Sequence, residues 1–124
     1  MILSSSLLKT TDNSGALIVS CIKVKKQHGK VGKIGSLIVV SVKKLRTNKQ
    51  MKTIKKGSIL LAIIVRTKKK KIRKNNLEFL FFTNSVILVN KQLKPISTRI
   101  IGLLPKELRT DKYMKIISMS AGLL

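Results

Sequence analysis

Ser58-Ile-Leu-Leu-Ala-Ile-Ile-Val-Arg66 decides the fold, because a short apolar, β-branched run between a turn signal and a basic segment predicts a β-strand. Outward from this stretch, Leu17–Val24 and Ser36–Lys43 repeat the same pattern. The turn signal Asp12-Asn-Ser-Gly15 precedes the first of them, and a basic connection that ends at Gly57 precedes Ser58. The three segments therefore predict three strands joined by polar loops.

Two further apolar segments, Leu77–Phe82 and Val86–Val89, bring the expected set to five or six strands. No connection has room for the crossover helix of a parallel sheet, so a mainly β fold, a small closed barrel, is favoured. Thr67–Asn76 is expected to project as a hairpin or loop, because Asn75-Asn76 tolerates the positive φ of a tight turn.

The pattern changes after Pro105, where short C-terminal helices are expected. Pro105 suits the start of one helix, and Thr110 or Asp111 can cap a second. One face of that second helix would carry Tyr113, Ile116, Ile117 and Ser120. We expect a single domain over residues 1–124, with a barrel over residues 1–104 and a helical segment over residues 105–124.

The charge of the chain points to a polyanionic partner. The 124 residues hold 27 Lys and Arg against four acids, a net charge of +23, so internal pairing cannot neutralise them. An apolar content of 44% still allows a folded core, unlike that of a disordered basic tail. The stretch from Lys23 to Lys74 contains no acid, and the partner is expected there.

Two polyanionic partners are considered, a nucleic acid and an anionic membrane, and the membrane is the weaker candidate. The longest apolar run, Ile59–Val65, has seven residues, whereas a spanning helix needs about 20. Met1–Thr10 fits a transit or secretory peptide poorly, so no cleaved leader is expected. The lone Cys21 excludes an internal disulfide and a multi-thiolate metal site, and it is expected to be a small buried apolar residue.

The inventory of reactive groups argues against an enzyme. The chain has one His, one Cys and four scattered carboxylates, too few to assemble a catalytic site. His28 stands in the polar stretch Lys26–Lys30, where a solvated or phosphate-facing imidazole is favoured over a general base. No catalytic residue, cofactor site or metal site is predicted.

Nucleic acid therefore remains, and the sequence predicts how it is contacted. Aromatic residues make up 3% of the chain, and Phe79, Phe81, Phe82 and Tyr113 are expected in the core rather than as stacking platforms. Lys and Arg would then contact phosphate and sugar and recognise the shape of folded RNA. Two basic protrusions, Lys44–Lys56 and Lys68–Lys74, would let one barrel clamp two RNA elements.

Ordered motifs along almost the whole chain carry a family resemblance. They are Asp12-Asn-Ser-Gly-Ala16, Cys21-Ile-Lys-Val24, Lys55-Lys-Gly57, Ala62–Lys69, Pro95-Ile, Thr98-Arg-Ile-Ile-Gly102, Lys106-Glu-Leu-Arg109 and Lys112–Ser118. In these motifs the chain is similar to the universal large-subunit ribosomal protein numbered fourteen, of the bacterial and organellar type. One departure is Asn75-Asn76, where the family pattern has Asp-Gly before an aromatic and an Asn, here Phe81 and Asn84.

The resemblance implies a five-stranded barrel with a projecting β-ribbon and short C-terminal helices. It implies a structural constituent of the large ribosomal subunit that binds large-subunit rRNA, touches neighbouring ribosomal proteins and helps to form bridges to small-subunit rRNA. Mapped onto this sequence, the expected rRNA-binding residues are Lys23, Lys25, Lys44, Arg46, Lys49, Lys55, Lys56, Arg66, Lys68 and Arg73. Docking of a ribosome silencing factor would use Thr98, Arg99 and Lys115.

Heavy use of Lys, Ile and Asn indicates an AT-rich coding genome, and we expect a mitochondrial, organelle-encoded protein. A plastid or an AT-rich bacterial cytoplasm would give the same composition. A free-standing basic barrel that binds single-stranded RNA or DNA as a chaperone is the alternative function. The shortage of aromatics speaks against this alternative.

Overall fold

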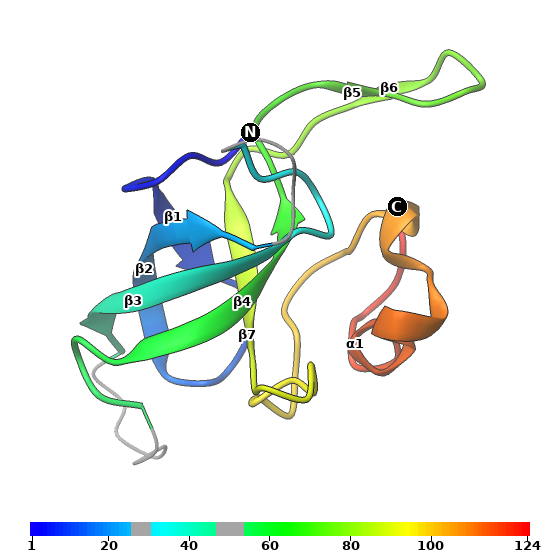
Figure 1. The fold of residues 1–124 in the computed structure, drawn as a ribbon. Coiled ribbons are helices and arrows are strands. Elements are labelled where there is room, and N and C mark those ends of the chain that lie inside the picture. The colour runs from blue at the N-terminus through cyan, green and yellow to red at the C-terminus, as the bar shows by residue number, and fades with distance from the viewer. Residues whose placement is uncertain (26–30, 47–53) are drawn as a thin grey trace.

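The computed structural model describes residues 1–25, 31–46 and 54–124. Five strands close into a barrel in the order β1-β2-β3-β4-β7 (Figure 1). Their bounds are β1 Leu7–Thr10, β2 Ala16–Val24, β3 Leu37–Leu45, β4 Ile59–Arg66 and β7 Ser85–Val89. All neighbouring pairs are antiparallel except β1 and β7, which run parallel and close the barrel. The predicted mainly β barrel is confirmed.

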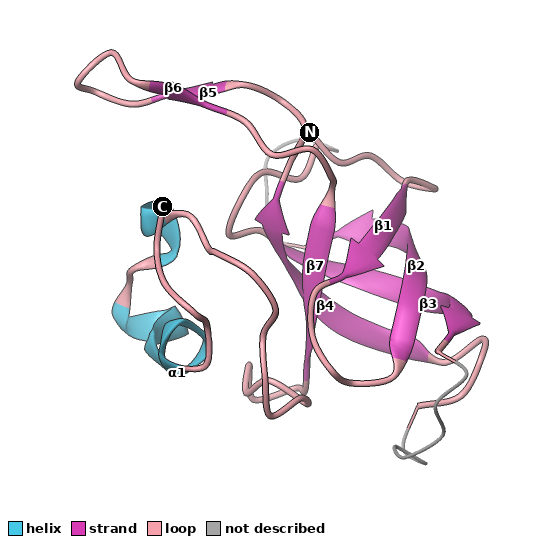
Figure 2. Cartoon of the chain, turned by 180° about the vertical axis from the view of Figure 1, so that it is seen from behind, coloured by secondary structure: helices cyan, strands magenta, loops and turns pink. Residues whose placement is uncertain are grey.

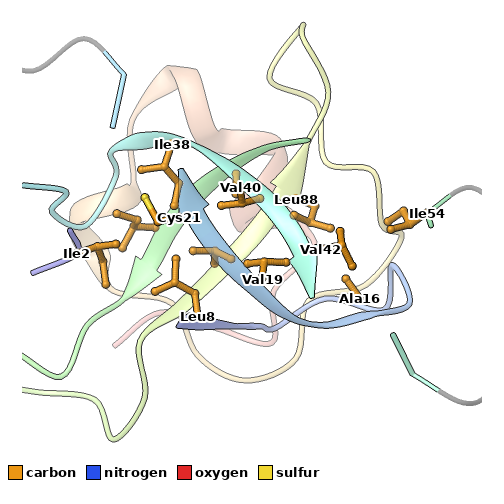
Figure 3. Packing of buried hydrophobic residues seen from close by; sticks show 13 residues of the cluster. Ile2, Leu8, Ala16, Val19, Cys21, Ile38, Val40, Val42, Ile54 and Leu88 are labelled. Atoms are coloured by element: carbon orange, nitrogen blue, oxygen red, sulfur yellow. The ribbon is translucent and has the colours of Figure 1, made fainter. Parts of the chain in front are cut away.

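Alternate residues of the strands fill the barrel, as the two-residue period of a strand requires. Val19 and Cys21 of β2, Ile38, Val40 and Val42 of β3, and Leu88 of β7 lie almost without solvent exposure in one cluster (Figure 3). Each buried aliphatic side chain of this size stabilises the fold by about 1.5 to 3 kcal/mol. Cys21 is 1% exposed, which confirms its prediction as a buried residue.

The N-terminal strand β1 is a part of the barrel that the sequence analysis did not identify. It has only four residues, and its Leu7 is 65% exposed, so its apolar pattern is weak. The turn after β1 secures it, because the buried Asp12 carboxylate accepts hydrogen bonds from Ser14 and from the Leu88 N–H of β7. Burial raises the pKa of Asp12, while the hydrogen bonds from Ser14 and Leu88 act in the opposite direction.

The segment after β4 forms a two-stranded ribbon that projects from one end of the barrel (Figure 2). Its strands are β5 Lys71–Ile72 and β6 Glu78–Phe79. At the tip, Asn76 has a φ of 60° and the Asn75 side chain accepts a hydrogen bond from Leu77 N, as expected for a tight turn. The prediction of Leu77–Phe82 as a barrel strand is wrong, because its register pairs it with β5 instead.

The core assignment of the three phenylalanines is also wrong, because the ribbon carries them away from the barrel. Phe79 and Phe81 are half-buried and contact each other edge to face, with ring centroids 5.8 Å apart. Phe82 is 90% exposed. Tyr113, in contrast, is 7% exposed and donates a hydrogen bond to the Gly35 carbonyl, so its core prediction is confirmed.

The C-terminal segment covers part of the outer face of the barrel (Figure 1). It holds two 3₁₀ helices, η1 Lys106–Leu108 and η2 Asp111–Tyr113, followed by the α-helix α1 Met114–Ser118. Pro105 and Thr110 directly precede the two 3₁₀ helices, although the Thr110 side chain makes no capping hydrogen bond. A second apolar cluster joins Leu104, Leu108, Tyr113 and Ile116 to Ile63, Val65, Ile87 and Val89 of the barrel wall.

Candidate nucleic-acid interface

The connection from β3 to β4 places a group of cations at one end of the barrel. Lys44, Arg46, Lys55 and Lys56 are exposed there. Backbone contacts fix their positions: Arg46 N donates to the Gly15 carbonyl, and Lys55 N donates to the Ser58 hydroxyl. Lys49 lies outside the described residues. The described part of this connection therefore presents cations to solvent on an ordered backbone.

A second cationic group lies at the opposite end, because the ribbon leaves the barrel where β4 ends and β7 begins. Lys23 and Lys68 are exposed there, and the Asn84 side chain accepts a hydrogen bond from Lys68 N. A hollow at the root of the ribbon is lined by Lys33, Ile34, Thr67, Lys69, Lys70 and Lys71. Lys70 also pairs with Glu78 of the ribbon.

The two ends are electrostatically separate surfaces. A nine-residue strand such as β3 extends about 30 Å, whereas the screening length at physiological salt is about 8 Å. The four acids offset few of these charges: Asp12 is buried, Glu78 and Glu107 pair with Lys70 and Arg73 of the ribbon, and Asp111 lies on the C-terminal segment. Each end can therefore attract its own anionic element.

Arg66, expected to bind RNA, makes hydrogen bonds within the chain itself. Its Nε donates to the Leu103 carbonyl at 2.9 Å and its Nη2 donates to the Ile101 carbonyl at 2.6 Å. Burial lowers the pKa of the Arg66 guanidinium. A Cβ on Gly102, which has a φ of +83°, would lie 2.5 Å from Nη2, so only a glycine leaves room for this contact. Arg66 thus ties the end of β4 to the chain that enters the C-terminal segment.

Arg73, also expected to bind RNA, connects the ribbon with the C-terminal segment. Its guanidinium bonds both carboxylate oxygens of Glu107, donates to the Leu124 carbonyl at 2.6 Å and lies 4.3 Å from the centre of the Phe79 ring. Burial raises the pKa of Glu107, but the hydrogen bond and charge of Arg73 outweigh this effect and lower it overall. The ribbon is therefore held at one side by a bidentate ion pair.

The residues expected to dock a silencing factor lie on two neighbouring segments. Thr98 and Arg99 are exposed, and the Asn13 side chain accepts hydrogen bonds from both of their backbone N–H groups. Ile100 N donates to the Met119 carbonyl, so this segment runs beside the end of α1. Lys115 is an exposed residue of α1. The fold thus brings the two segments together on one side.

Sequence reasoning missed the contribution of Lys33 to the hollow at the root of the ribbon. Lys33 and Lys69–Lys71 are far apart in the sequence, and the approach of β3 and β4 joins them. The pairing of β3 with β4 would have to be known in advance to place Lys33 near the ribbon. The hollow therefore gathers lysines from two distant segments of the chain into one cationic surface.

The described residues give little support to a metal site, a membrane-spanning helix or a reactive cysteine. Residues 1–25, 31–46 and 54–124 contain no group of three or more His, Cys, Asp or Glu that could hold a metal ion. Among the same residues, no helix is long and apolar enough to cross a membrane. Burial raises the pKa of the Cys21 thiol, which disfavours the reactive thiolate. His28 lies outside the described residues.

The fold and the charge distribution define a small basic β-barrel protein with cationic loops at both ends and a lysine-rich ribbon. The family model for ribosomal protein L14p/L23e matches residues 1–124, the whole chain, and the chain belongs to this family. It is accordingly a ribosomal protein of the large subunit, and the family is of a structural, non-enzymatic kind that serves translation.

Proposed function

We propose that this chain binds large-subunit rRNA through both cationic ends of its barrel and so holds two RNA elements in a fixed relation. The observation that carries the proposal is the placement of the two cationic groups at opposite ends of one rigid barrel. The proposed phosphate contacts are Lys23, Lys44, Arg46, Lys49, Lys55, Lys56 and Lys68, to which the structure adds Lys33 and Lys69–Lys71.

Arg66 and Arg73 have a different part in this proposal. Their guanidinium groups are engaged with carbonyl and carboxylate oxygens of the chain itself. They position the ribbon and the C-terminal segment, and any phosphate contact that they make is secondary to this role. Their removal would therefore change protein stability as well as RNA binding.

Bridges to small-subunit rRNA are the second part of the proposal. A surface with net charge +23 retains cations for a further RNA beyond those that face the large subunit. Docking of a ribosome silencing factor on Thr98, Arg99 and Lys115 is proposed because all three are exposed and the segments that carry them adjoin. Neither activity requires catalysis, and we propose that the chain is not an enzyme.

We further propose the mitochondrion as the location of the ribosome that contains this chain. Its Lys, Ile and Asn content supports an AT-rich organellar gene. A plastid or an AT-rich bacterium has the same support from composition. Detection of the protein in purified mitochondria, and its absence from the other fractions, would decide among the three.

Sedimentation of ribosomal particles through sucrose at moderate and then at high salt tests the proposal. We expect the protein to migrate with the large subunit and to resist the high-salt wash. Each phosphate contact weakens as salt rises, but the contacts at both ends must break together before the protein leaves the particle. Recovery at the top of the gradient under both conditions would contradict rRNA binding.

A free RNA-binding barrel is the second candidate, and the exposed ring of Phe82 favours it. An exposed aromatic beside lysines can stack a nucleobase of single-stranded RNA. Free protein at the top of the gradient, with Phe82→Ala weakening its binding to single-stranded oligonucleotides by about 5- to 150-fold, would place this candidate first.

A further inference from the structure

The outer face of the barrel carries more apolar surface than the C-terminal segment covers. Ile63 and Val65 of β4 are buried beneath that segment. In the antiparallel register Val39 pairs with Leu61, so these two continue the same face of the sheet away from the covered part. Ile59, at the start of β4, extends it and is 68% exposed. The face therefore ends in an apolar area that no described segment covers completely.

This area is hollowed and has lysines at its border. Two adjoining hollows share Lys25, Leu61 and Lys91. Val39, Ile59 and Leu61 form the floor of one, and the other runs along Leu37 to Lys112 and Tyr113. Lys25, Lys91 and Lys112 thus stand around an apolar floor, and no acid lines either hollow. We call this feature the lysine-rimmed groove.

RNA fits the groove poorly. Val39, Ile59 and Leu61 offer no hydrogen bond to a phosphate. An RNA backbone placed on this floor would lose water from its phosphates without gaining hydrogen bonds in return. A nucleobase could stack only on an open ring, and the one aromatic residue of the groove, Tyr113, is 7% exposed. The apolar floor is therefore better suited to contact with the apolar side chains of a protein.

A second copy of the chain fits no better. Two chains of charge +23 repel each other, and few acids are available to form ion pairs with the lysines. Asp12 is buried, Glu78 and Glu107 are already paired, and Asp111 is exposed on the C-terminal segment. A second copy would therefore bring one exposed carboxylate against several lysines, and the occupant must carry more acids than this chain does.

We propose that the lysine-rimmed groove seats an extended segment of another large-subunit protein. Its apolar side chains cover Val39, Ile59 and Leu61, and its Asp or Glu side chains reach Lys25 and Lys91. Charge complementarity and continuity with the apolar face under the C-terminal segment support this partner. The inference rests on the proposed place of the chain in the rRNA-bound large subunit. It assigns Lys25 to a protein contact rather than to a phosphate.

Site-directed photo-cross-linking in the assembled large subunit tests the inference. Ile59→Cys carries a benzophenone maleimide, and Leu7→Cys, similarly exposed on β1, is the control. The native Cys21 is 1% exposed and stays unlabelled. We expect the probe at position 59, and not that at position 7, to cross-link one ribosomal protein at a peptide with apolar residues beside Asp or Glu.

A charge reversal makes the test specific for the rim. Lys91→Glu should lower the cross-linking yield from position 59 by about tenfold, the effect expected when one well-placed ion pair is removed. Lys9→Glu on β1 should leave the yield unchanged. A cross-link to rRNA or to a second copy, or no cross-link from particles that contain the protein, would overturn the inference alone. Absence of the protein from the large subunit would overturn the proposed function and this inference together.

Discussion

At the scale of single residues, two arginines that resemble phosphate contacts in the sequence act as internal ties. Arg66 bonds two carbonyls of the segment 101–103, and Arg73 bonds Glu107. A basic run in a sequence shows charge but not the direction of each side chain. The structure separates these two from Lys44, Arg46, Lys55 and Lys56, whose side chains are exposed.

Arg66→Ala should lower the free energy of unfolding by about 1.5 to 3 kcal/mol, because it removes the hydrogen bonds from a charged donor to two carbonyls. Urea denaturation of the purified protein measures the change. Arg66→Lys should recover only part of it, since an ammonium lacks the planar fork that reaches both carbonyls. Unchanged stability in both variants would mean that Arg66 serves RNA contact alone.

Glu107 gives the fold a defined pH response. Its pKa is lowered from 4.5 in the folded chain, so the ion pair with Arg73 stabilises above the ordinary value and this contribution is lost as the pH falls through the folded value. Glu107→Gln should therefore lower the free energy of unfolding near pH 7, and its difference from wild type should be smaller at pH 3. Urea titrations at both pH values, with the exposed Asp111→Asn as control, measure it. An equal difference at both pH values would contradict the ion-pair explanation.

At the scale of elements, the long strands β2, β3, β4 and β7 could be predicted because each has a strong apolar pattern. The short strand β1 could not, since tertiary contacts through Asp12 and the parallel pairing with β7 hold it in place. Phe79–Phe82 shows the opposite case: its apolar run predicts core packing, but its partner strand lies in the ribbon. Local pattern does not identify the pairing partner.

The ribbon turn gives a test at this scale. Asn76 has a φ of 60°, so Asn76→Val should destabilise the ribbon by about 1 to 2 kcal/mol, whereas Asn76→Gly should preserve it. Hydrogen exchange at Arg73 N and Asn76 N, both bonded within the turn, reports on the ribbon alone. Equal protection in the valine and glycine variants would show that the turn does not require the left-handed conformation.

At the scale of the whole molecule, the excess charge could be predicted from composition, but its division into two ends could not. The division depends on closure of the barrel, in which the end of β3 and the start of β4 lie opposite the end of β4 that leads into the ribbon. Closure also brings Lys33 to Lys69–Lys71. The sequence predicted two basic protrusions, and topology explains why both remain accessible at once.

Separated ends make an additive prediction for RNA binding. Lys44, Arg46 and Lys55 changed to Gln at one end, or Lys69, Lys70 and Lys71 changed to Gln at the other, should each reduce the salt dependence of binding to transcribed large-subunit rRNA. The slope of log K against log salt should fall by about 0.7 to 0.9 for each phosphate that is no longer neutralised. Because the ends lie about 30 Å apart and screening acts over about 8 Å, the slope of the six-residue variant should fall by the sum of the two effects. Filter binding at several salt concentrations measures the slopes. A combined reduction no larger than that of one set would contradict independent binding of RNA by the two ends.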